Sequence, residues 1–464
     1  MVYMSCFLLI RLAVVVSTRL QARSAFHALQ SKSNQIIGRI PLQASIAGRV
    51  TATCRFLPPL ISHRFASSAR VQVKPYKLHN VESGPNAEVT VTRDDALNIY
   101  TRMQTIRRLE AAAGNLYKEQ KIRGFCHLYA GEEACAVGIK SAMEPNDAII
   151  TSYRCHGWTY LCGPSVVPVL CELTGRMNGN VHGKGGSMHM YGDNFYGGNG
   201  IVGAQQPLGT GVAFAMKCRK MKNVCFTLFG DGAANQGQLF EYDENCCSMS
   251  SFGQVECVLQ MSSLVLSYRR AMNIAKLWNI PVVYVCENNG YGFGTSTKRA
   301  CAAKHYYDRV SYMPGVWVDG MDVLAVREAA RWAKEWCNAG KGPLMLEMST
   351  YRYGGHSVAD PGTSYRTREE VEEVRRTRDA INGFKEKVIP TGLLTEDELK
   401  EIDKKIRKEV DEAAKMARTG KEATTDLLLT DLYHNTPPQL VRCTTDYVRQ
   451  PYTNSNEACR ALGQ

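Results

Sequence analysis

Residues 224–241, VCFTLFGDGAANQGQLFE, run from a predicted strand through a glycine-rich turn into the start of a predicted helix, and this order of elements indicates the fold class. The first half of this stretch is a continuous apolar run, which is typical of a parallel strand covered on both faces. Asp231 follows between two glycines, where a carboxylate can reach a hard cation. The backbone amides of Gly232 and Ala233 would then face phosphate oxygens at the helix start.

Short apolar runs of the same kind recur along the chain and alternate with helical stretches. We expect strands at 148–153, 224–230, 280–287, 315–320 and 343–353. Buried strands separated by helices indicate the α/β class, with a doubly wound, mostly parallel sheet and flanking helices. Ligands of such sheets bind at the carboxyl ends of the strands, so the loops there form the expected site. These loops begin after Tyr153, Phe229, Glu287 and Tyr353.

A second polar loop, ENNGYG at 287–292, follows the next predicted strand. Asn289 offers a neutral amide oxygen, and Tyr291 offers a free backbone carbonyl. With the carboxylate of Asp231 they would leave room for two diphosphate oxygens and a water, which suits Mg²⁺. The alternative interpretation is two ordinary turns rich in Gly and Asn.

Two glycine-rich segments look like nucleotide-binding motifs but fail on their context. GNGIVG, 198–203, fits GxGxxG, yet no apolar strand precedes it and basic residues follow where an acid is needed. HGKGGS, 182–187, lacks both the first glycine and the Ser/Thr of a P-loop. We interpret both as loops whose backbone closely approaches a ligand.

The positive charge is concentrated at the N-terminus. The chain of 464 residues has a formal charge of +12, but residues 1–81 hold 11 Lys/Arg and no acid, which leaves +1 for the rest. The body therefore lacks the basic surface that a nucleic-acid partner requires. No apolar run reaches the roughly 18 residues of a membrane span.

An acid-free leader rich in Arg and Ser is typical of a mitochondrial transit peptide, which we predict at 1–64, with processing near Phe65 and a location in the mitochondrial matrix. A secretory signal is the alternative, but no basic residue precedes the apolar run. After the leader we expect a polar linker at 65–92, one domain at 93–435 and a C-terminal tail at 436–464. The 17 cysteines contain no CxxC pair, so neither a disulfide nor a metal–thiolate site is predicted.

Several motifs together resemble a known family. GDGAANQGQ followed by NN is similar to the thiamine diphosphate motif, and further segments resemble, in order, the α subunits of mitochondrial pyruvate dehydrogenase E1 components. These segments are RGFCHLY, TSYRCHG, GKGGSMHMY, FYGGNGIVGAQ, VDGMD and YRYGGHSVADPGTSYRTREE. The resemblance runs from about residue 90 to at least 420. The branched-chain 2-oxo acid E1 α subunits are the second choice, because they typically have Glu for the motif's Asp and lack GGSMHMY.

The resemblance implies the thiamine diphosphate-binding fold and a set of site residues. Mg²⁺ would be held by Asp231, Asn289 and the carbonyl of Tyr291. Thiamine diphosphate would be bound by Tyr153, Arg154, Gly200, Val202, Gly232, Ala233, Asn289 and His356. The active-site histidines would be His127 and His356. Phosphorylation would occur at Ser357, Ser364 and Ser296.

The resemblance also implies the reaction and the partners. Pyruvate would be oxidatively decarboxylated and its acetyl group passed to the lipoyl domain of the E2 component, which yields acetyl-CoA and CO₂ in the whole complex. The family's α subunit works with a β subunit in an α2β2 heterotetramer, and the β subunit supplies the Glu that activates the cofactor. A pyruvate dehydrogenase kinase and phosphatase would act on the serines.

One segment departs from the family pattern. Asp231 and Asn289 are 58 residues apart, whereas this motif normally spans about 30, and removing 242–270 restores the spacing. We predict an insertion there, either a translated intron or gene-model artefact, or a genuine addition that loops out. A genuine insertion would interrupt a helix beside the metal loop. The alternative function is therefore a noncatalytic isoform that acts as an assembly or regulatory partner of the β subunit.

Overall fold

The computed structural model describes residues 66–163, 165–235, 271–303, 305–424, 427, 440–442 and 449–451. The predicted transit peptide with its processing site, and the predicted insertion at 242–270, lie outside these residues. In the part of the chain that is described, no helix has the length and apolar character needed to cross a membrane.

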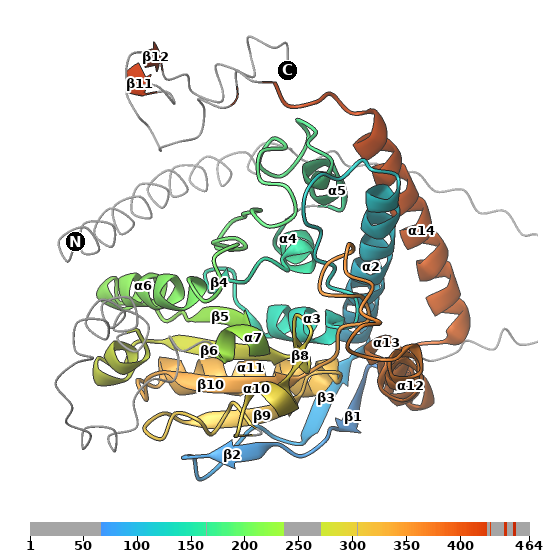
Figure 1. Ribbon diagram of the computed structural model, residues 1–464. Coiled ribbons are helices and arrows are strands. Elements are labelled where there is room, and N and C mark those ends of the chain that lie inside the picture. The colour runs from blue at the N-terminus through green and yellow to red at the C-terminus, as the bar shows by residue number, and fades with distance from the viewer. Residues whose placement is uncertain are drawn as a thin grey trace, which may run out of the picture. The chain divides into compact units, whose positions relative to one another are not determined.

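A six-stranded sheet in the order β2-β9-β10-β6-β5-β4 forms the centre of the fold (Figure 1). Its strands are β2 (Lys77–His79), β4 (Ala148–Ile150), β5 (Cys225–Gly230), β6 (Val282–Asn288), β9 (Gly315–Asp319) and β10 (Leu344–Ser349). All neighbours are parallel except β2, which pairs antiparallel with β9. The prediction of a mostly parallel α/β sheet is confirmed.

Helices cover both faces of this sheet, as expected for a doubly wound fold. α6 (Gln205–Cys218) packs on β4, β5 and β6, and α11 (Val323–Asn338) packs on β6, β9 and β10. The other helices up to α11 are α2 (Arg93–Lys118), α3 (Glu133–Ala142), α4 (His156–Cys162), α5 (Val167–Leu173), α7 (Asp231–Ala234) and α10 (Thr297–Ala300). Successive side chains of a strand point to opposite faces. Accordingly, Val283 and Val285 of β6 join the core formed with α2, α3 and α11, whereas Val282 and Tyr284 join the core formed with α6.

The close packing of α3 on α11 explains a glycine in the middle of α3. A Cβ at Gly138 would lie only 2.5 Å from Cγ1 of Val326 on α11. The contact therefore leaves no room for a larger side chain. Because α3 begins immediately after Glu132, this packing also fixes the position of a carboxylate that faces the site.

Residues 66–92, the described part of the predicted linker at 65–92, contribute three strands to the fold. β1 (Ser68–Gln72) pairs antiparallel with β3 (Glu88–Thr92), and β2 forms an edge of the main sheet. Val71, Val89 and Val91 are buried. Alternating valines provide a half-buried strand face, and this period-2 pattern outweighs the polar composition that suggested a linker.

The C-terminal part of the domain is helical, with α12 (Arg368–Arg378), α13 (Ala380–Val388), the 3₁₀ turn η2 (Ile389–Thr391) and α14 (Glu396–Thr419). α14 buries Leu399, Ile406 and Val410 on one face. Two short pairs complete the strands: β7 (Tyr291–Gly292) with β8 (Thr295–Ser296), and β11 (Leu440–Arg442) with β12 (Arg449–Pro451). The described part of the predicted tail is this last pair.

Candidate active site

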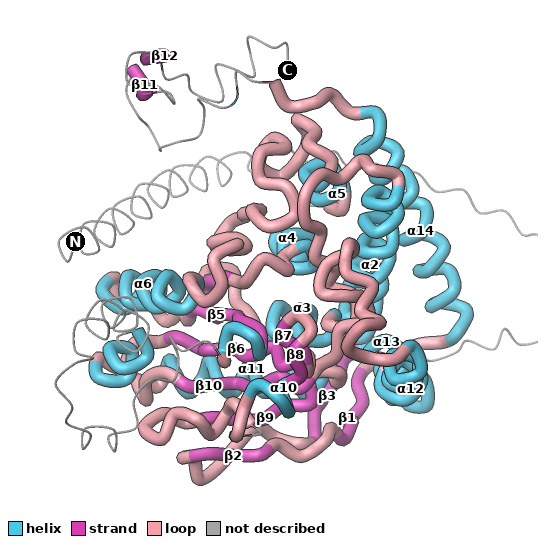
Figure 2. The backbone as a smooth tube through the Cα atoms, in the orientation of Figure 1, coloured by secondary structure: helices cyan, strands magenta, loops and turns pink. Residues whose placement is uncertain are grey.

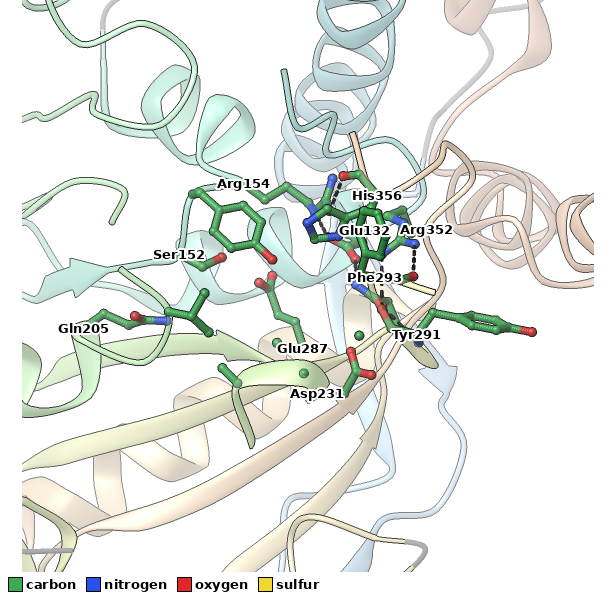
Figure 3. A pocket seen from close by; sticks show the side chains of 17 residues that line it. Glu132, Ser152, Arg154, Gln205, Asp231, Glu287, Tyr291, Phe293, Arg352 and His356 are labelled. Atoms are coloured by element: carbon green, nitrogen blue, oxygen red, sulfur yellow. Dashed lines mark hydrogen bonds and ion pairs between the residues drawn. The ribbon is translucent and has the colours of Figure 1, made fainter. Parts of the chain in front are cut away.

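The carboxyl ends of β4, β5, β6 and β10 bring side chains to one pocket (Figure 3). In the sheet, Gly230 pairs with Glu287 and Ser349 pairs with Asn288, so neighbouring strands end at the same level. The loops that follow therefore meet above the sheet edge. The predicted site residues that line the pocket are Tyr153, Arg154, Val202, Asp231, Gly232, Ala233, Asn289, Tyr291 and His356.

Two predicted residues, His127 and Gly200, do not line the pocket. The buried imidazole of His127 lies directly behind it, with its ring centroid 4.4 Å from Tyr153 and 5.2 Å from His356. Gly200 belongs to the loop at 198–203, where an added Cβ would lie 3.4 Å from Nε2 of His189. Of this loop, Val202 reaches the pocket wall.

Asp231 provides a buried carboxylate that lacks a full set of partners. Its side chain is only 2 % exposed, and its Oδ2 has no hydrogen-bond partner among the described residues. Burial raises the pKa of Asp231 to about 7, and the nearby Arg352 partly offsets this effect. A buried carboxylate oxygen without a partner is costly, so this atom is suited to receive a cation.

The remaining predicted metal ligands lie on the loop after β6. The Asn289 amide donates from Nδ2 to Oε1 of Glu132 at 2.8 Å, and its Oδ1 accepts from the Tyr291 N–H at 3.3 Å. The carbonyl of Tyr291 accepts from Nη1 of Arg352 at 3.2 Å. The Tyr291 phenol points away from the pocket and donates to Glu370 (Figure 3). Only the backbone of Tyr291 is thus directed toward the site.

Two buried guanidinium groups supply positive charge. Arg154 donates from Nη1 to the carbonyl of Leu128 and from Nη2 to the carbonyl of His356 at 3.0 Å, and its Nε lies 3.7 Å from Oε2 of Glu132. Arg352 joins the loops after β6 and β10. Burial lowers the pKa of Arg352, and the charge of Arg154 acts in the same direction. Both groups favour an anionic ligand.

Several residues of the pocket wall were not among the predicted site residues: Glu132, Ser152, Gln205, Gly230, Glu287, Gly292, Phe293 and Arg352. Of these, Glu132 and Glu287 are fully buried carboxylates. Burial raises the pKa of Glu287 to about 8, the charge of Glu132 adds to this, and the Tyr129 hydroxyl donates to Glu287 and opposes it. Burial also raises the pKa of Glu132, against the lowering effect of Arg154.

The two predicted histidines are held in the neutral form. Burial lowers the pKa of His127 to about 3 and that of His356 to about 4, and Arg154 is the next largest cause in both cases. The Nδ1 atoms of both rings are buried without a hydrogen-bond partner among the described residues. A neutral imidazole with a free ring nitrogen can accept a proton or donate a hydrogen bond to a bound group.

Comparison with known proteins agrees with this geometry. A family model described as "Dehydrogenase E1 component" matches residues 101–252 and 268–426. The chain belongs to the dehydrogenase E1 component family. It is 65 % identical over 405 residues to the mitochondrial pyruvate dehydrogenase E1 component subunit alpha type II of Ascaris suum, covering 87 % of this chain and 96 % of that protein.

Two further members of the dehydrogenase E1 family extend the comparison. The probable mitochondrial pyruvate dehydrogenase E1 component subunit alpha of Caenorhabditis elegans is 60 % identical over 393 residues. The somatic form of that mitochondrial subunit from Homo sapiens is 47 % identical over 388 residues. Both alignments cover 84 % of this chain and 92 % of the relative. The family match is interrupted at 253–267, within the predicted insertion.

The glycine-rich segment that resembled a P-loop is hydrogen-bonded through its backbone to a buried carboxylate. Residues 174–204, between α5 and α6, consist of loops and turns (Figure 2). The buried carboxylate of Glu172 accepts hydrogen bonds from the backbone N–H groups of Val181, Gly183, Gly185 and Gly186 at 2.7–3.3 Å. These four amides of the loop therefore approach the protein's own carboxylate.

The loop after β10 carries two of the predicted phosphorylation sites. Asp360 accepts hydrogen bonds from the His356 N–H at 2.6 Å and the Gly362 N–H at 2.9 Å, and also from the Tyr365 hydroxyl. This arrangement folds the loop back on itself beside the pocket. Ser357 is buried in it, Ser364 is exposed, and Ser296 on the neighbouring β8 is half-buried. Of the three hydroxyl groups, that of Ser364 is therefore the most accessible to an enzyme.

Proposed function

We propose that this chain is the α subunit of a mitochondrial pyruvate dehydrogenase E1 component that decarboxylates pyruvate with thiamine diphosphate and Mg²⁺. The relatives described above are all named as mitochondrial α subunits of this enzyme, so the predicted family, enzyme class and mitochondrial location are confirmed. The single observation that carries the site assignment is the buried, unpartnered carboxylate of Asp231, beside oxygen donors and two guanidinium groups.

The residues present fit a hydrated divalent cation. Asp231, the amide oxygen of Asn289 and the carbonyl of Tyr291 form a set of hard oxygen donors, which Mg²⁺ prefers. The carbonyl of Tyr291 already accepts a hydrogen bond from Arg352, but a carbonyl oxygen has a second lone pair for the cation. Arg352 would thus orient a ligand carbonyl while Asp231 supplies the charge.

The remaining wall residues fit a diphosphate and a heteroaromatic ring. The amides of Gly232 and Ala233, the Tyr153 phenol and the fork of Arg154 would bind the diphosphate. Val202 would contact the aminopyrimidine ring, and Gly200, two residues earlier in the same loop, lies outside the pocket wall. When bound, thiamine diphosphate supplies a carbanion that adds to the 2-oxo acid and takes up the electrons left after loss of CO₂.

The two histidines would then handle protons and developing charge. Because burial lowers the pKa of both His127 and His356, either neutral ring is better suited to donate a hydrogen bond toward a substrate oxygen than to accept a proton. The exposed ring of Phe293 contacts His356, with ring centroids 4.8 Å apart, at the pocket wall.

The β subunit and pyruvate are the immediate partners of an E1 α subunit. We further propose that the acetyl group passes to the lipoyl domain of E2, in an α2β2 assembly in which the β subunit supplies the activating Glu. A kinase and phosphatase would act on Ser364, Ser357 and Ser296. A phosphate at Ser357, next to His356, would repel the diphosphate by its charge of roughly −1.5 to −2.

The second candidate is a noncatalytic isoform, which the 58-residue separation of Asp231 and Asn289 favours. The test is pyruvate decarboxylation by the chain co-expressed with its β partner. The chain as given is compared with a variant lacking 242–270, each with and without Asp231→Asn. Activity that requires Mg²⁺, thiamine diphosphate and Asp231 in either form supports the proposal. Absence of activity in both, with the β subunit bound, would overturn it.

A further inference from the structure

A chain of buried polar side chains lies beneath the active site and belongs to neither the predicted nor the observed pocket wall. It contains Glu110 on α2, His156 at the start of α4 and Ser187 at the end of the glycine-rich loop. Nδ1 of His156 lies 3.0 Å from Oε2 of Glu110, and Nε2 lies 2.8 Å from the Ser187 hydroxyl. Glu110 and His156 are 0 % exposed and Ser187 is 5 % exposed.

Both ends of this chain bind the same short stretch of backbone. The Ser187 hydroxyl accepts from the His127 N–H at 3.3 Å, and Oε1 of Glu110 accepts from the Tyr129 N–H at 2.9 Å. The two contacts bracket residues 127–129. Each of these three residues contacts a residue of the pocket wall, whereas Glu110, His156 and Ser187 do not line the pocket.

The three residues of this stretch contact the site in different ways. The imidazole of His127 packs against Tyr153 and His356. The carbonyl of Leu128 accepts from the guanidinium of Arg154, and the hydroxyl of Tyr129 donates to the carboxylate of Glu287. A shift of this stretch would therefore move an imidazole, an arginine fork and a carboxylate together.

One arrangement of protons gives a hydrogen-bond partner to each polar atom that Glu110, His156 and Ser187 direct at one another. With Glu110 ionised, His156 carries its proton on Nδ1 and donates to the carboxylate, and Nε2 accepts from the Ser187 hydroxyl. The lone pairs of that hydroxyl remain available for the His127 N–H. The same donors and acceptors occur in hydrolase triads, but here all three groups are buried, so the serine cannot reach a substrate. The geometry suits orientation, not nucleophilic attack.

We propose that Glu110, His156 and Ser187 are positioning residues that hold residues 127–129, and through them His127, Arg154 and Glu287, in the geometry that the reaction requires. The proposal rests on the proposed function of the pocket. Removing the Ser187 hydroxyl would free the His127 end of the stretch while Glu110 still holds the Tyr129 end, so His127 is the group most affected.

The test is a double-mutant cycle in the full chain co-expressed with its β partner. Ser187→Ala is expected to lower kcat for pyruvate on the order of 10- to 100-fold with a smaller change in KM, the size typical of orienting partners. In a His127→Ala background the same change is expected to cost less than about 3-fold, because the group it positions is gone. An equal loss in both backgrounds would overturn the proposal.

The matched control is Thr174→Val, which removes another buried hydroxyl, one that donates to carbonyls of Leu170, Cys171 and Ala417 away from the pocket. It is expected to leave kcat within about 3-fold of the parent enzyme. Ser187→Thr retains the hydroxyl and is expected to recover most of the activity lost in Ser187→Ala. A Thr174→Val loss as large as that of Ser187→Ala would indicate a general packing defect and contradict the proposal.

Amide hydrogen exchange tests, without relying on activity, whether Glu110, His156 and Ser187 hold residues 127–129 in place. Peptides that contain residues 127–129 are expected to exchange faster in Ser187→Ala than in the parent chain, and to be unchanged in Thr174→Val. If residues 127–129 exchange faster in Ser187→Ala but the parent complex is inactive, the positioning role stands and the proposed function of the pocket is refuted. Unchanged exchange of residues 127–129 in Ser187→Ala would refute the positioning role itself.

Discussion

The Glu172 carboxylate offers a sharp test of how the glycine-rich loop is held. Its two oxygens accept four backbone N–H groups at 2.8, 2.9, 2.7 and 3.3 Å, and the side chain is fully buried. Glu172→Gln keeps the shape but leaves one acceptor oxygen. The new NH₂ group would face two N–H donors, which then have no partner. The substitution therefore converts two charge-assisted hydrogen bonds into two donor–donor contacts.

The size of the effect follows from these contacts. Each hydrogen bond to a charged group contributes about 1.5–3 kcal/mol, so losing two costs about 3–6 kcal/mol. This is comparable to the whole stability of many domains, about 5–15 kcal/mol. The loop has another option, because its backbone can turn outward and bind water. We therefore expect residues 181–186 to open locally, with a smaller effect on global unfolding.

The assay is amide hydrogen exchange combined with urea unfolding. In Glu172→Gln, the amides of residues 181–186 are expected to exchange at least about 100-fold faster, which corresponds to about 3 kcal/mol of local stability. Glu335→Gln, an exposed position on α11, is the matched control and should change neither observable. Parent-like exchange at 181–186 in Glu172→Gln would refute the anchoring role of the carboxylate.

Three other predictions concern His127, Arg352 and Gly209. Since burial lowers the pKa of His127 to about 3, the unfolded chain binds a proton below pH 6.5 that the native chain does not. The free energy of unfolding should therefore fall by at most about 4 kcal/mol as the pH drops toward 3, and should fall less in His127→Asn. Urea unfolding at several pH values checks this, and an equal dependence of the free energy on pH in both proteins would contradict it. Arg352→Lys should weaken thiamine diphosphate binding by calorimetry about 10- to 100-fold, because an ammonium cannot reach both loops; unchanged affinity would count against its orienting role. Gly209→Ala should lower the free energy of unfolding by about 1–3 kcal/mol, since its Cβ would lie 2.0 Å from Oγ1 of Thr227. Gly383→Ala is the control and should not destabilise the protein, because a Cβ there would lie in open space. The thermal melting midpoints of the two variants check this prediction.

The sequence predicted the parts of the site that follow a strand. Asp231 and Asn289 stand where an apolar run ends, and local patterning marks such positions, whereas His356 was assigned from the family resemblance. Glu287 was equally marked, because it is the last buried residue of a run that continues into two asparagines. The sheet order and the level register of the strand ends then bring these residues together, as the rule for parallel sheets requires.

The rest of the site could not be predicted from local pattern. Glu132 lies in AGEEACAV, where an acid looks like an ordinary residue of a helical first turn, and Glu172 lies within the apolar helix VPVLCEL. Their partners are 157 and 9–14 residues away in the chain, so only the tertiary fold reveals them. Polar composition also concealed β1–β3, where the alternating valines were the better indicator.

The buried charges of the pocket connect its stability with its chemistry. Glu132 is compensated by Asn289 and Arg154, and Glu287 by the Tyr129 hydroxyl, but Oδ2 of Asp231 has no compensation among the described residues. An ionised carboxylate in that position costs the fold several kcal/mol, which is why burial raises its pKa to about 7. A cation bound to Asp231 would compensate this buried charge, so the cost of the ionised carboxylate would be recovered in the free energy of cation binding. An Asn at position 231 carries no charge and would provide no such gain. Asp231 therefore destabilises the ligand-free protein and favours the cation-bound protein.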